Sequence, residues 1–353
     1  MSTRTPAVIL GGTGYVAGEL LRLTLGHPRL ALAAIASDSK PGEPVAAAFP
    51  HLASACAGLR YVSIEEAGDL VAKSPRAAVL SAAPHGVSDV LIDGILKKSE
   101  AAGANPAVVD ISADYRYADL AEYERVYRHA HGAPARAKQF SCAVPEHLER
   151  APTPHVAHPG CFATAVLLAC VPLLKLGLVD GPVFVSAVTG STGAGRSPIP
   201  GTHHPQRHGD LYAYNALVHR HSAEVRALAK AAAGRDWQLA FMPHSGPFAR
   251  GIHATVQAKL AMPLDTAGAV AALAGFYAGK PFVRVQPEPP RVKDVVASNY
   301  AHLSAAANGD TIAVMAVIDN LVKGAAGGAL QWMNRLLGFE ETAGLTAPAP
   351  GWT

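Results

Sequence analysis

The sequence predicts an α/β protein with two domains, and three observations lead to this fold class. The 353 residues exceed the length at which a single hydrophobic core is usual. Half of them are hydrophobic and 16% are charged, which is typical of a folded chain. Short apolar runs alternate with glycine turns and helical patterns near the N-terminus, as the strand–helix–strand units of a parallel sheet do.

A glycine-rich turn joins the first predicted strand to the first helix. Apolar residues 7–10 run directly into the turn, a leucine-rich helical pattern follows, and residues 30–36 form the next apolar run. Glycines here let the backbone approach a pyrophosphate, which then lies on the helix N-terminus. We therefore predict a Rossmann-like domain that binds a dinucleotide; the alternative is a plain turn in another doubly wound domain. The predicted contacts are Gly11, Thr13, Gly14, Tyr15 and Val16.

The end of the second strand is ambiguous about which dinucleotide is bound. Asp38 stands where an acidic residue holds the ribose 2′-hydroxyl of NAD. Ser37, Ser39 and Lys40 offer the donors that the 2′-phosphate of NADP attracts. These four residues alone leave both NAD and NADP open.

Two further apolar strands, at residues 77–83 and 108–109, end in polar loops, and helical patterns follow at 87–98 and 118–131. Ligands in open α/β sheets bind at the carboxyl ends of strands. Arg116 lies in the second loop, and its planar guanidinium matches a phosphate or a carboxylate. Without such a ligand it would be a solvated loop charge.

Cys161 lies between a Pro-Gly turn and an apolar run, residues 166–178, that predicts a helix. A cysteine at a helix N-terminus faces unpaired backbone N–H groups and the positive end of the macrodipole. Both favour the thiolate, which is the reactive form. The alternative is a small buried residue, since free cysteine is among the most buried types.

The second half of the chain predicts strands at residues 183–188, 252–259 and 311–318, and helices at 266–279 and up to about 337. A glycine-rich loop follows the first of these strands and is suited to an anion or a ring. A histidine-rich segment comes next. His219 and His221 fall on one side if their stretch is extended.

Composition argues against several classes of partner and location. The net charge is +3 without a long basic block, so neither nucleic acid nor an anionic membrane is expected. The four cysteines lie far apart without CxxC pairs, which favours free thiols and a reducing, cytoplasmic compartment. The most apolar stretch, 163–179, carries Pro172 and Lys175 and is too short to span a membrane. No metal is expected, because HExxH and paired CxxC motifs are missing.

The order and spacing of the motifs resemble those of the N-acetyl-γ-glutamyl-phosphate reductase family, relatives of aspartate-semialdehyde dehydrogenase. The resemblance runs from about residue 9 to residue 336. The matching segments are residues 11–21, 84–88, 110–116, 159–161, 190–196, 219–221, 243–251 and 319–327. The chain departs from the family pattern at His158, where asparagine is usual, and at Asp38, where arginine tends to stand.

The resemblance implies a dinucleotide-binding domain at residues 1–157 and an α+β domain at 158–318 for catalysis and subunit contacts. It also implies that residues 319–353 form a helix and tail that return to the first domain. The implied reaction is NADPH-dependent reduction of an acyl phosphate to an aldehyde with release of phosphate. The enzyme would be a homodimer or homotetramer acting on a small molecule.

The resemblance also implies residue roles. Cys161 is the nucleophile that forms a thioester, and His219 and His221 manage protons, with His244 ranked third. The nicotinamide would be bordered by Gly193, Ala194 and Asn320. The implied substrate contacts are Arg116 for the phosphate, Arg196 and Arg250 for a carboxylate (or else as structural ion pairs), and His244.

Four alternatives stay open on sequence. Residues 201–207 are like the branch that acts on carrier-protein-bound substrates in lysine biosynthesis. Aspartate-semialdehyde dehydrogenase itself uses the same chemistry on a shorter substrate. Five histidines between residues 203 and 221 suggest a metal enzyme, which leaves the glycine turn unexplained. A non-catalytic dinucleotide-binding subunit would leave Cys161 unexplained.

Overall fold

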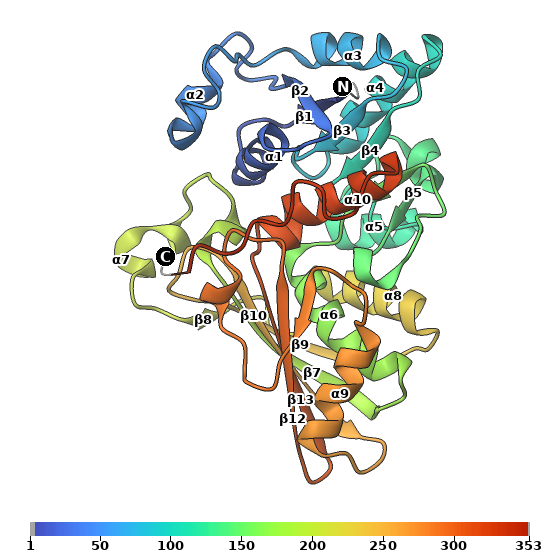
Figure 1. Ribbon diagram of the computed structural model, residues 1–353, viewed down its shortest axis with the longest axis vertical. Helices are drawn as coiled ribbons and strands as arrows, with labels where there is room; N and C mark the ends of the chain where they lie inside the picture. The colour runs from blue at the N-terminus through green and yellow to red at the C-terminus, as the bar shows by residue number, and fades with distance from the viewer. Residues whose placement is uncertain (1–3, 352–353) are drawn as a thin grey trace. The chain divides into compact units, whose positions relative to one another are not determined.

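The structure is a computed structural model that describes residues 4–351, and the chain divides into two compact units (Figure 1). The first unit holds the chain up to residue 143, residues 150–158 and residues 326–346. The second holds residues 144–149, residues 159–325 and the chain from residue 347. The predicted boundaries place all of residues 319–353 on the first domain. In the structure only residues 326–346 belong to the first unit, and residues 319–325 and 347–351 belong to the second.

The first unit is built on a parallel sheet in the order β2-β1-β3-β4-β6-β5. Its strands are β1 Thr5–Leu10, β2 Leu30–Ile35, β3 Ala78–Ser81, β4 Ala107–Asp110, β5 Phe140–Cys142 and β6 His155–Ala157. Its helices are α1 Tyr15–Leu25, α2 Val45–Ala48, α3 Ile64–Ala72, α4 Ser88–Ala101, α5 Leu120–Tyr127 and α10 Gly327–Leu337. The predicted parallel α/β fold of this part is confirmed.

The strands of this sheet are apolar because both of their faces are covered. Figure 1 shows α3 and α4 on one side of the sheet and α10 on the other. Val8, Val79 and Val108 lie in the core on these central strands. The C-terminal helix α10 is anchored by Trp332, whose indole Nε1 donates to the Ala143 carbonyl at 2.8 Å. The C-terminal helix therefore returns to the first unit, as the resemblance implied.

The second unit is built on a mixed sheet in the order β11-β12-β13-β10-β7-β9-β8. Its strands are β7 Val179–Thr189, β8 Tyr212–Ala213, β9 Leu239–Ser245, β10 Ile252–Leu260, β11 Val283–Val285, β12 Ala301–Asn308 and β13 Thr311–Ile318. Its helices are α6 Cys161–Lys175, α7 His204–Arg207, α8 His221–Ala233 and α9 Thr266–Phe276. A π-helical turn, Val322–Ala326, follows β13.

One face of this sheet carries the helices. Helix α6 packs on β10 and β13, α8 packs on α6, and α9 packs on β12. Successive side chains of β10 point to opposite faces of the sheet, so Ile252, Ala254 and Val256 are buried toward α6. The opposite face of β10 and β7 carries exposed residues, including Phe184 at 54% exposure.

Two of the predicted helices have different ends in the structure. Helix α6 begins at Cys161 rather than at residue 166, because Gly160 is extended (ψ 156°) and places the thiol in the first turn. It ends at Lys175 rather than at residue 178. The helix predicted at 118–131 is the shorter α5, which stops where Arg128 adopts φ 64°.

Candidate active site

The glycine turn of the first unit is shaped by close backbone contact. Gly11 has φ 72°, and a Cβ there would lie 2.5 Å from the Cα of Ala83, so only glycine fits. Gly14 is the N-cap of α1, no side chain caps the helix there, and a Cβ on it would meet nothing within 4 Å. The first turn of α1 thus combines a helix N-terminus with open space, which suits a pyrophosphate.

Tyr61 supports this turn from a loop that the sequence did not single out. Its hydroxyl donates to the Gly12 carbonyl at 3.0 Å, and its side chain is 2% exposed. The Gly12 N–H donates to the Ala36 carbonyl at 2.9 Å. Phe49 of the same loop lies against Gly18, where a Cβ would stand 2.8 Å from the phenyl ring. The loop therefore fixes the glycine turn against the end of β2.

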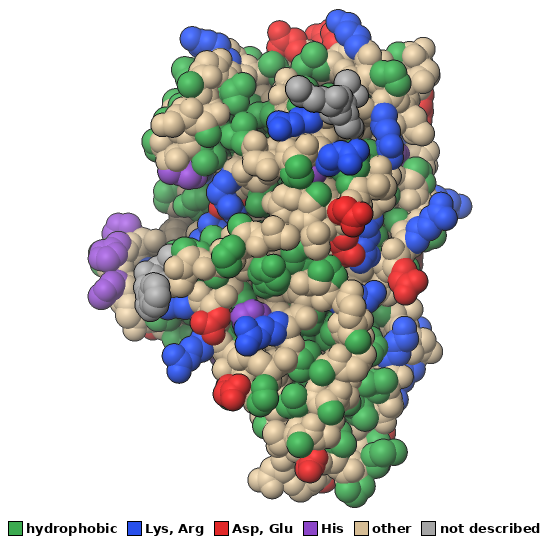
Figure 2. Space-filling view, in the orientation of Figure 1, with side chains coloured by type: hydrophobic (Ala, Val, Ile, Leu, Met, Phe, Trp, Pro, Cys, Tyr) green, Lys and Arg blue, Asp and Glu red, His purple; other side chains and the backbone are tan. Residues whose placement is uncertain are grey.

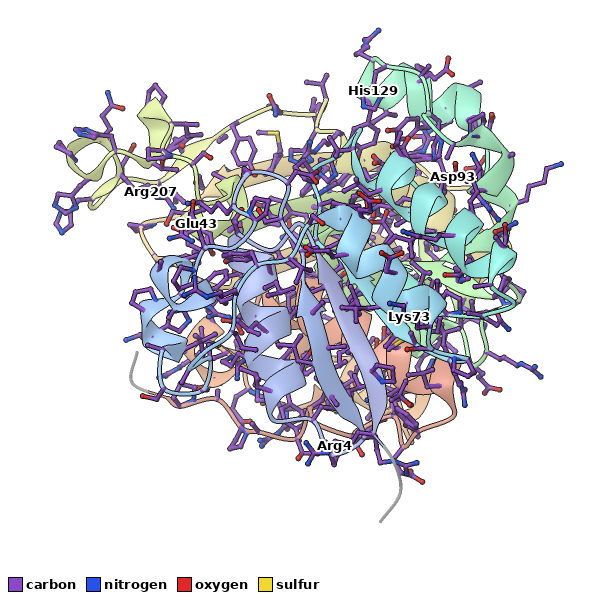
Figure 3. All side chains as sticks on the ribbon, turned by 90° about the horizontal axis from the view of Figure 1, so that it is seen from above. Arg4, Glu43, Lys73, Asp93, His129 and Arg207 are labelled. Atoms are coloured by element: carbon purple, nitrogen blue, oxygen red, sulfur yellow. The ribbon has the colours of Figure 1, made fainter. Side chains whose placement is uncertain are left out.

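The predicted ribose-binding residues share the carboxyl edge of β1 and β2 with the glycine turn. Ser37 is buried, and its hydroxyl lies 3.3 Å from that of Ser39. The side chain of Asp38 is exposed. Lys40 forms an ion pair of 2.8 Å with Glu43, which is labelled in Figure 3. Two hydroxyls and one ammonium thus lie near an exposed carboxylate.

The loop after β4 is held by buried polar groups. Ser88 and Ser112 both donate to the carboxylate of Asp110, at 2.7 and 2.6 Å. Burial raises the pKa of Asp110 to about 6. Arg116, 8% exposed, donates to the carbonyls of His158 at 2.9 Å and Ile111 at 2.7 Å. Arg116 thus braces this loop, and its predicted contact with a substrate phosphate stays a prediction.

Cys161 is the first residue of α6 in the second unit; it is partly buried and forms no disulfide within residues 4–351. The residue before it, Gly160, donates its N–H to Glu224 Oε1 at 2.6 Å. Glu224 lies on α8 and is 1% exposed. Sequence reasoning missed Glu224, because the 64 positions between the two residues form no motif. The Glu224 carboxylate holds the N-cap residue, Gly160, through this bond. Gly160 has no side chain of its own to cap the helix.

His219 and His221 lie together, with ring centroids 4.8 Å apart. Both rings contact Phe162, the residue that follows Cys161, with ring centroids 5.7 and 6.3 Å apart. Their stretch is not extended, since His221 opens α8. Tyr214 packs on His219 at 5.6 Å, and burial and then the charge of Cys161 raise the pKa of its phenol. The structure therefore gathers the thiol, the two histidines and a tyrosine in one region of the second unit.

The protonation state of His219 follows from its burial. Burial, and then the neighbouring charge of Arg220, lower the pKa of His219 to about 4. The ring is therefore neutral at pH 7. Its Nδ1 accepts the N–H of His221 at 3.1 Å, so the hydrogen of the neutral ring is on Nε2. The predicted role of His219 in proton transfer stays a prediction.

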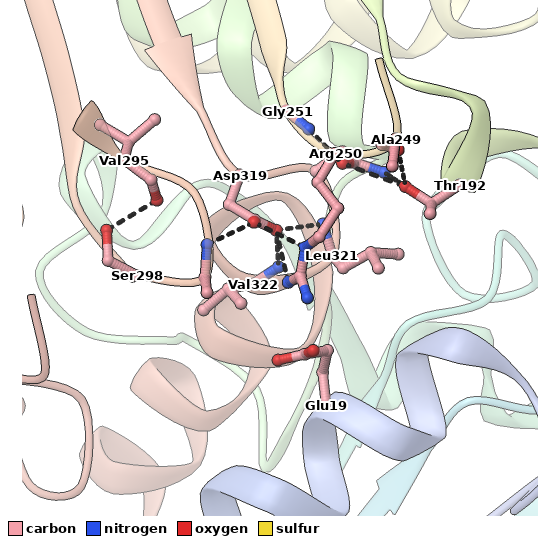
Figure 4. A network of polar contacts seen from close by, with 12 residues as sticks. Glu19, Thr192, Ala249, Arg250, Gly251, Val295, Ser298, Asp319, Leu321 and Val322 are labelled. Carbon is pink, nitrogen blue, oxygen red and sulfur yellow. Dashed lines mark hydrogen bonds and ion pairs between the residues drawn. The ribbon is translucent and has the colours of Figure 1, made fainter. Parts of the chain in front are cut away.

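Arg250 belongs to a polar network around the loop after β7 that includes Thr192 and Asp319 (Figure 4), and Asn320 is hydrogen-bonded to the same loop. Asn320, 2% exposed, accepts the N–H of Gly251 at 2.7 Å and donates to the Thr192 hydroxyl at 3.0 Å. Thr192 precedes the predicted nicotinamide neighbours Gly193 and Ala194, both exposed. The network thereby joins this loop to the end of β13.

Arg250 makes a two-bond pair with Asp319, at 3.0 and 3.1 Å. Asp319 is fully buried and also accepts the N–H groups of Leu321 and Val322, both at 2.8 Å. The structural ion pair considered for Arg250 is therefore present. Its contact with a substrate carboxylate stays a prediction.

The other predicted substrate contacts lie elsewhere in the second unit. Arg196 is exposed in the loop that follows residues 191–194. His244 lies within β9, paired with Val188 of β7, and its buried Nδ1 has no hydrogen-bond partner among residues 4–351. Their roles remain predictions.

The remaining histidines of this region are surface residues. Figure 2 shows histidine side chains together at the surface over α7, where His203, His204 and His208 are exposed. Arg207, labelled in Figure 3, points the other way and donates to the Ser245 hydroxyl at 2.7 Å. Within residues 4–351 no three His, Cys, Asp or Glu side chains are grouped as metal ligands. None of the helices described is both long and apolar enough to cross a bilayer.

Comparisons with known proteins assign the two halves of the chain. Residues 6–157 match the semialdehyde dehydrogenase NAD-binding domain, and residues 161–320 match the semialdehyde dehydrogenase dimerisation domain. The chain belongs to the semialdehyde dehydrogenase family.

Relatives within the family are named more specifically. An N-acetyl-gamma-glutamyl-phosphate reductase of Rhodospirillum rubrum is 37% identical, with 98% of each chain covered. One of Symbiobacterium thermophilum is 38% identical over 97% of each. A putative [LysW]-L-2-aminoadipate/[LysW]-L-glutamate phosphate reductase of Aeropyrum pernix is 36% identical over 99% of each. The resemblance drawn from the motifs is therefore confirmed.

Solved structures agree on the fold. Aspartate semialdehyde dehydrogenase II of Vibrio cholerae has a TM-score of 0.67 at 16% identity, covering 96% of this chain and 99% of its own. The Candida albicans aspartate semialdehyde dehydrogenase, solved with NADP, has a TM-score of 0.66 at 14% identity, covering 95% and 99%. At such identities the likeness shows the fold alone.

Proposed function

We propose that this chain is an NADP-dependent N-acetyl-γ-glutamyl-phosphate reductase of arginine biosynthesis, active in the cytoplasm. It reduces the acyl phosphate to N-acetylglutamate semialdehyde and releases phosphate. The observation that supports this most is Cys161 in the first turn of α6, in the same region as His219, His221 and Tyr214. The relatives named as this reductase, 37% and 38% identical over nearly the whole chain, support the choice of substrate.

Cys161 acts as the nucleophile. Its sulfur forms a bond to the acyl carbon, the carbon–oxygen bond to phosphate breaks, and phosphate leaves with the electron pair, so the product is a thioester. The backbone N–H groups of the first turn of α6 favour the thiolate and donate to the oxyanion of the tetrahedral intermediate. Glu224 keeps Gly160, and with it this turn, in place.

His219 contributes a donor rather than a positive charge. Because its neutral ring carries hydrogen on Nε2, it offers a hydrogen bond to the sulfur anion or to the oxyanion. Reduction of the thioester carbon leaves a hemithioacetal oxyanion on Cys161. Its carbon–oxygen double bond re-forms as the sulfur–carbon bond breaks, the sulfur leaves as a thiolate with the electron pair, and the proton that His221 took from the thiol returns to it. His221 remains the proposed proton acceptor for the thiol.

The dinucleotide, when bound, supplies the hydride that reduces the acyl carbon. The glycine turn fits its pyrophosphate, because Gly14 leaves open space at an uncapped helix N-terminus. The residues that would hold it are Gly11, Thr13, Gly14, Tyr15 and Val16 at the turn, and Ser37, Ser39 and Lys40 at the ribose phosphate. Gly193, Ala194 and Asn320 are proposed to border the nicotinamide, and Arg116, Arg196, His244 and Arg250 to contact the substrate.

Self-association through the uncovered sheet face is part of the proposal. In β7, Phe184 is 54% exposed on the face opposite to α6, and an exposed phenyl ring on a regular strand favours a contact with a second copy. Light scattering should give the mass of a dimer or a tetramer, and a monomer at all concentrations would refute this part.

A second candidate function is the same chemistry on a carrier-bound substrate. The Aeropyrum pernix relative is named for a LysW-linked substrate, and its identity to this chain is about that of the others. The segment from residue 199 to 218 is exposed and apolar enough to meet a protein partner, with Ile199, Leu211, Leu217 and Val218 at 49–78% exposure.

The reaction run backwards tests the proposal. N-acetylglutamate semialdehyde, phosphate and NADP⁺ should yield NADPH only when all three are present. Aspartate semialdehyde, and a glutamate semialdehyde carried on a protein, serve as competing substrates, and NAD⁺ as the competing cofactor. NADPH formation that does not depend on phosphate would refute acyl-phosphate chemistry. A preference for the carrier-bound aldehyde would favour the second candidate function.

A further inference from the structure

The segment that closes the second unit carries a buried lysine for which the reaction has no use. The side chain of Lys323 is fully buried, and its Nζ lies 2.5 Å from Oε1 of Glu146, which is also buried. The two residues are 177 positions apart. The ammonium also lies 5.5 Å from the centre of the Phe282 ring. A lysine ammonium that is buried away from water needs an opposite charge beside it, so the ion pair with Glu146 holds the Lys323 side chain in one position.

Lys323 projects from an unusual turn of backbone. Residues Val322–Ala326 form a π-helix, and the Gly324 N–H donates to the Asp319 carbonyl at 2.9 Å. Such turns hold an extra residue, are rare, and occur frequently at functional sites. Asp319 anchors the beginning of this turn through the N–H groups of Leu321 and Val322. The ion pair of Lys323 anchors its middle.

The next residue, Gly324, lies directly against the nucleophile. A Cβ built on Gly324 would stand 2.8 Å from the Cβ of Cys161 and 3.1 Å from its Cα. These distances are shorter than real contacts of this kind, so any side chain here would displace Cys161 or the turn. The backbone of the turn therefore forms one wall beside the cysteine.

The partner of the lysine is tied back to the same helix. Glu146 is followed by His147, whose Nε2 lies 2.9 Å from the Tyr277 hydroxyl. That hydroxyl donates to the carbonyl of Leu168 at 2.6 Å, two turns along α6 from Cys161. The contacts thus form a closed ring that starts at the first turn of α6 and returns to its middle.

We propose that Lys323 is a positioning residue for Cys161: its ion pair with Glu146 holds the π-helical turn whose Gly324 backbone lies against the nucleophile. The proposal rests on the proposed function, in which Cys161 attacks the acyl phosphate. Replacing Lys323 by methionine removes the anchor and leaves the carboxylate of Glu146 buried without its cation. The turn then relaxes away from Cys161, and the thiol loses its defined position.

Three variants separate positioning from stability. Lys323→Met and the double variant Lys323→Met/Glu146→Leu remove the anchor, the second without leaving an unpaired charge. Gly324→Ala keeps the ion pair and disturbs the contact with Cys161. Leu273→Ala, a fully buried residue of α9, serves as the control for a general loss of stability. Each is measured for kcat, for the KM of NADPH, for melting temperature, and for the pH profile of iodoacetamide reaction with Cys161.

We expect the two lysine variants and Gly324→Ala to lower kcat by 10-fold or more, with the KM of NADPH within about 3-fold of the wild type. Cys161 alkylation should slow or shift its pH midpoint in all three, and stay unchanged in Leu273→Ala. A double variant that folds and keeps wild-type kcat and alkylation would overturn the proposal. If the lysine variants do not fold, wild-type behaviour of Gly324→Ala overturns it. Alkylation is read without substrate, so these results stand apart from turnover by Cys161→Ser, which would instead refute the proposed function.

Discussion

At the scale of single residues, the chemistry of His219 depends on its tautomer. A ring with a pKa of about 4 stays neutral across the physiological range, and its Nδ1 is already occupied by the His221 N–H. The atom left to face the reacting groups is Nε2 with its hydrogen. In the proposed mechanism this ring therefore stabilises negative charge by donating a hydrogen bond.

His219→Ala should lower kcat at pH 7 by about 10²-fold, at the low end of what the loss of one hydrogen-bond donor to an oxyanion costs. Part of the rate should return at alkaline pH, where the thiol ionises without help. The wild-type rate should not fall between pH 7 and 5 through this ring, because its pKa is about 4. A variant with the wild-type rate at every pH would assign the role to His221 or His244 instead. The ¹⁵N shifts of His219 should report hydrogen on Nε2.

The sequence allowed the residue types of the site to be predicted but not their partners. Cys161, the two histidines and the glycine turn each stand in a local motif whose spacing has a physical meaning. Glu224, Tyr61 and Lys323 were missed, because each acts on a residue 49 to 177 positions away. Such pairs exist only once the chain has folded.

At the scale of secondary structure, the glycine turn depends on a loop that covers it. Tyr61→Phe removes the hydrogen bond from that hydroxyl to the Gly12 carbonyl and leaves the ring in place. The loss of one buried hydrogen bond, about 1 kcal/mol, should weaken NADPH binding roughly 5-fold. Tyr123→Phe is the matched control, because its hydroxyl bonds to Asp114 instead. Equal effects of the two variants on NADPH affinity would contradict a specific role for Tyr61.

Helices and strands could be predicted where the local sequence pattern favours the same secondary structure that the fold contains. The parallel strands β1 and β2 and the helix α1 between them follow directly from apolar runs and glycine turns. The strand β12, Ala301–Asn308, was not predicted, because alanine and asparagine have low strand propensity. It forms because it lies between β13 and β11 in the sheet, and pairing there outweighs local preference.

At the scale of the whole molecule, buried titratable groups set the response to acid. Burial lowers the pKa of His147, His155 and His219 from 6.5 to about 4 each. Below pH 6.5 the unfolded chain binds protons that the folded chain does not, so stability falls as the pH drops toward 4. Asp110 acts in the opposite direction, because its pKa is raised to about 6 and protonation then favours the folded state.

We therefore expect the free energy of unfolding to fall on going from pH 7 to pH 4. Each histidine contributes up to about 3 kcal/mol and Asp110 offsets about the same amount, so the net loss is on the order of 5 kcal/mol. Urea unfolding at several pH values measures this directly, and histidine resonances followed by NMR assign the groups. Equal or greater stability at pH 4 would show that these histidines are not buried as described.

The central claim is that Cys161 carries the acyl group. The most direct measurement is the mass of the protein after incubation with N-acetyl-γ-glutamyl phosphate and no dinucleotide, followed by peptide mapping. We predict one N-acetylglutamyl group on the peptide that contains Cys161, removed by hydroxylamine or by NADPH, and none on Cys161→Ser, which should still bind NADPH. An enzyme that turns over yet shows no acyl group on Cys161, or a Cys161→Ser variant that keeps its activity, would contradict the account.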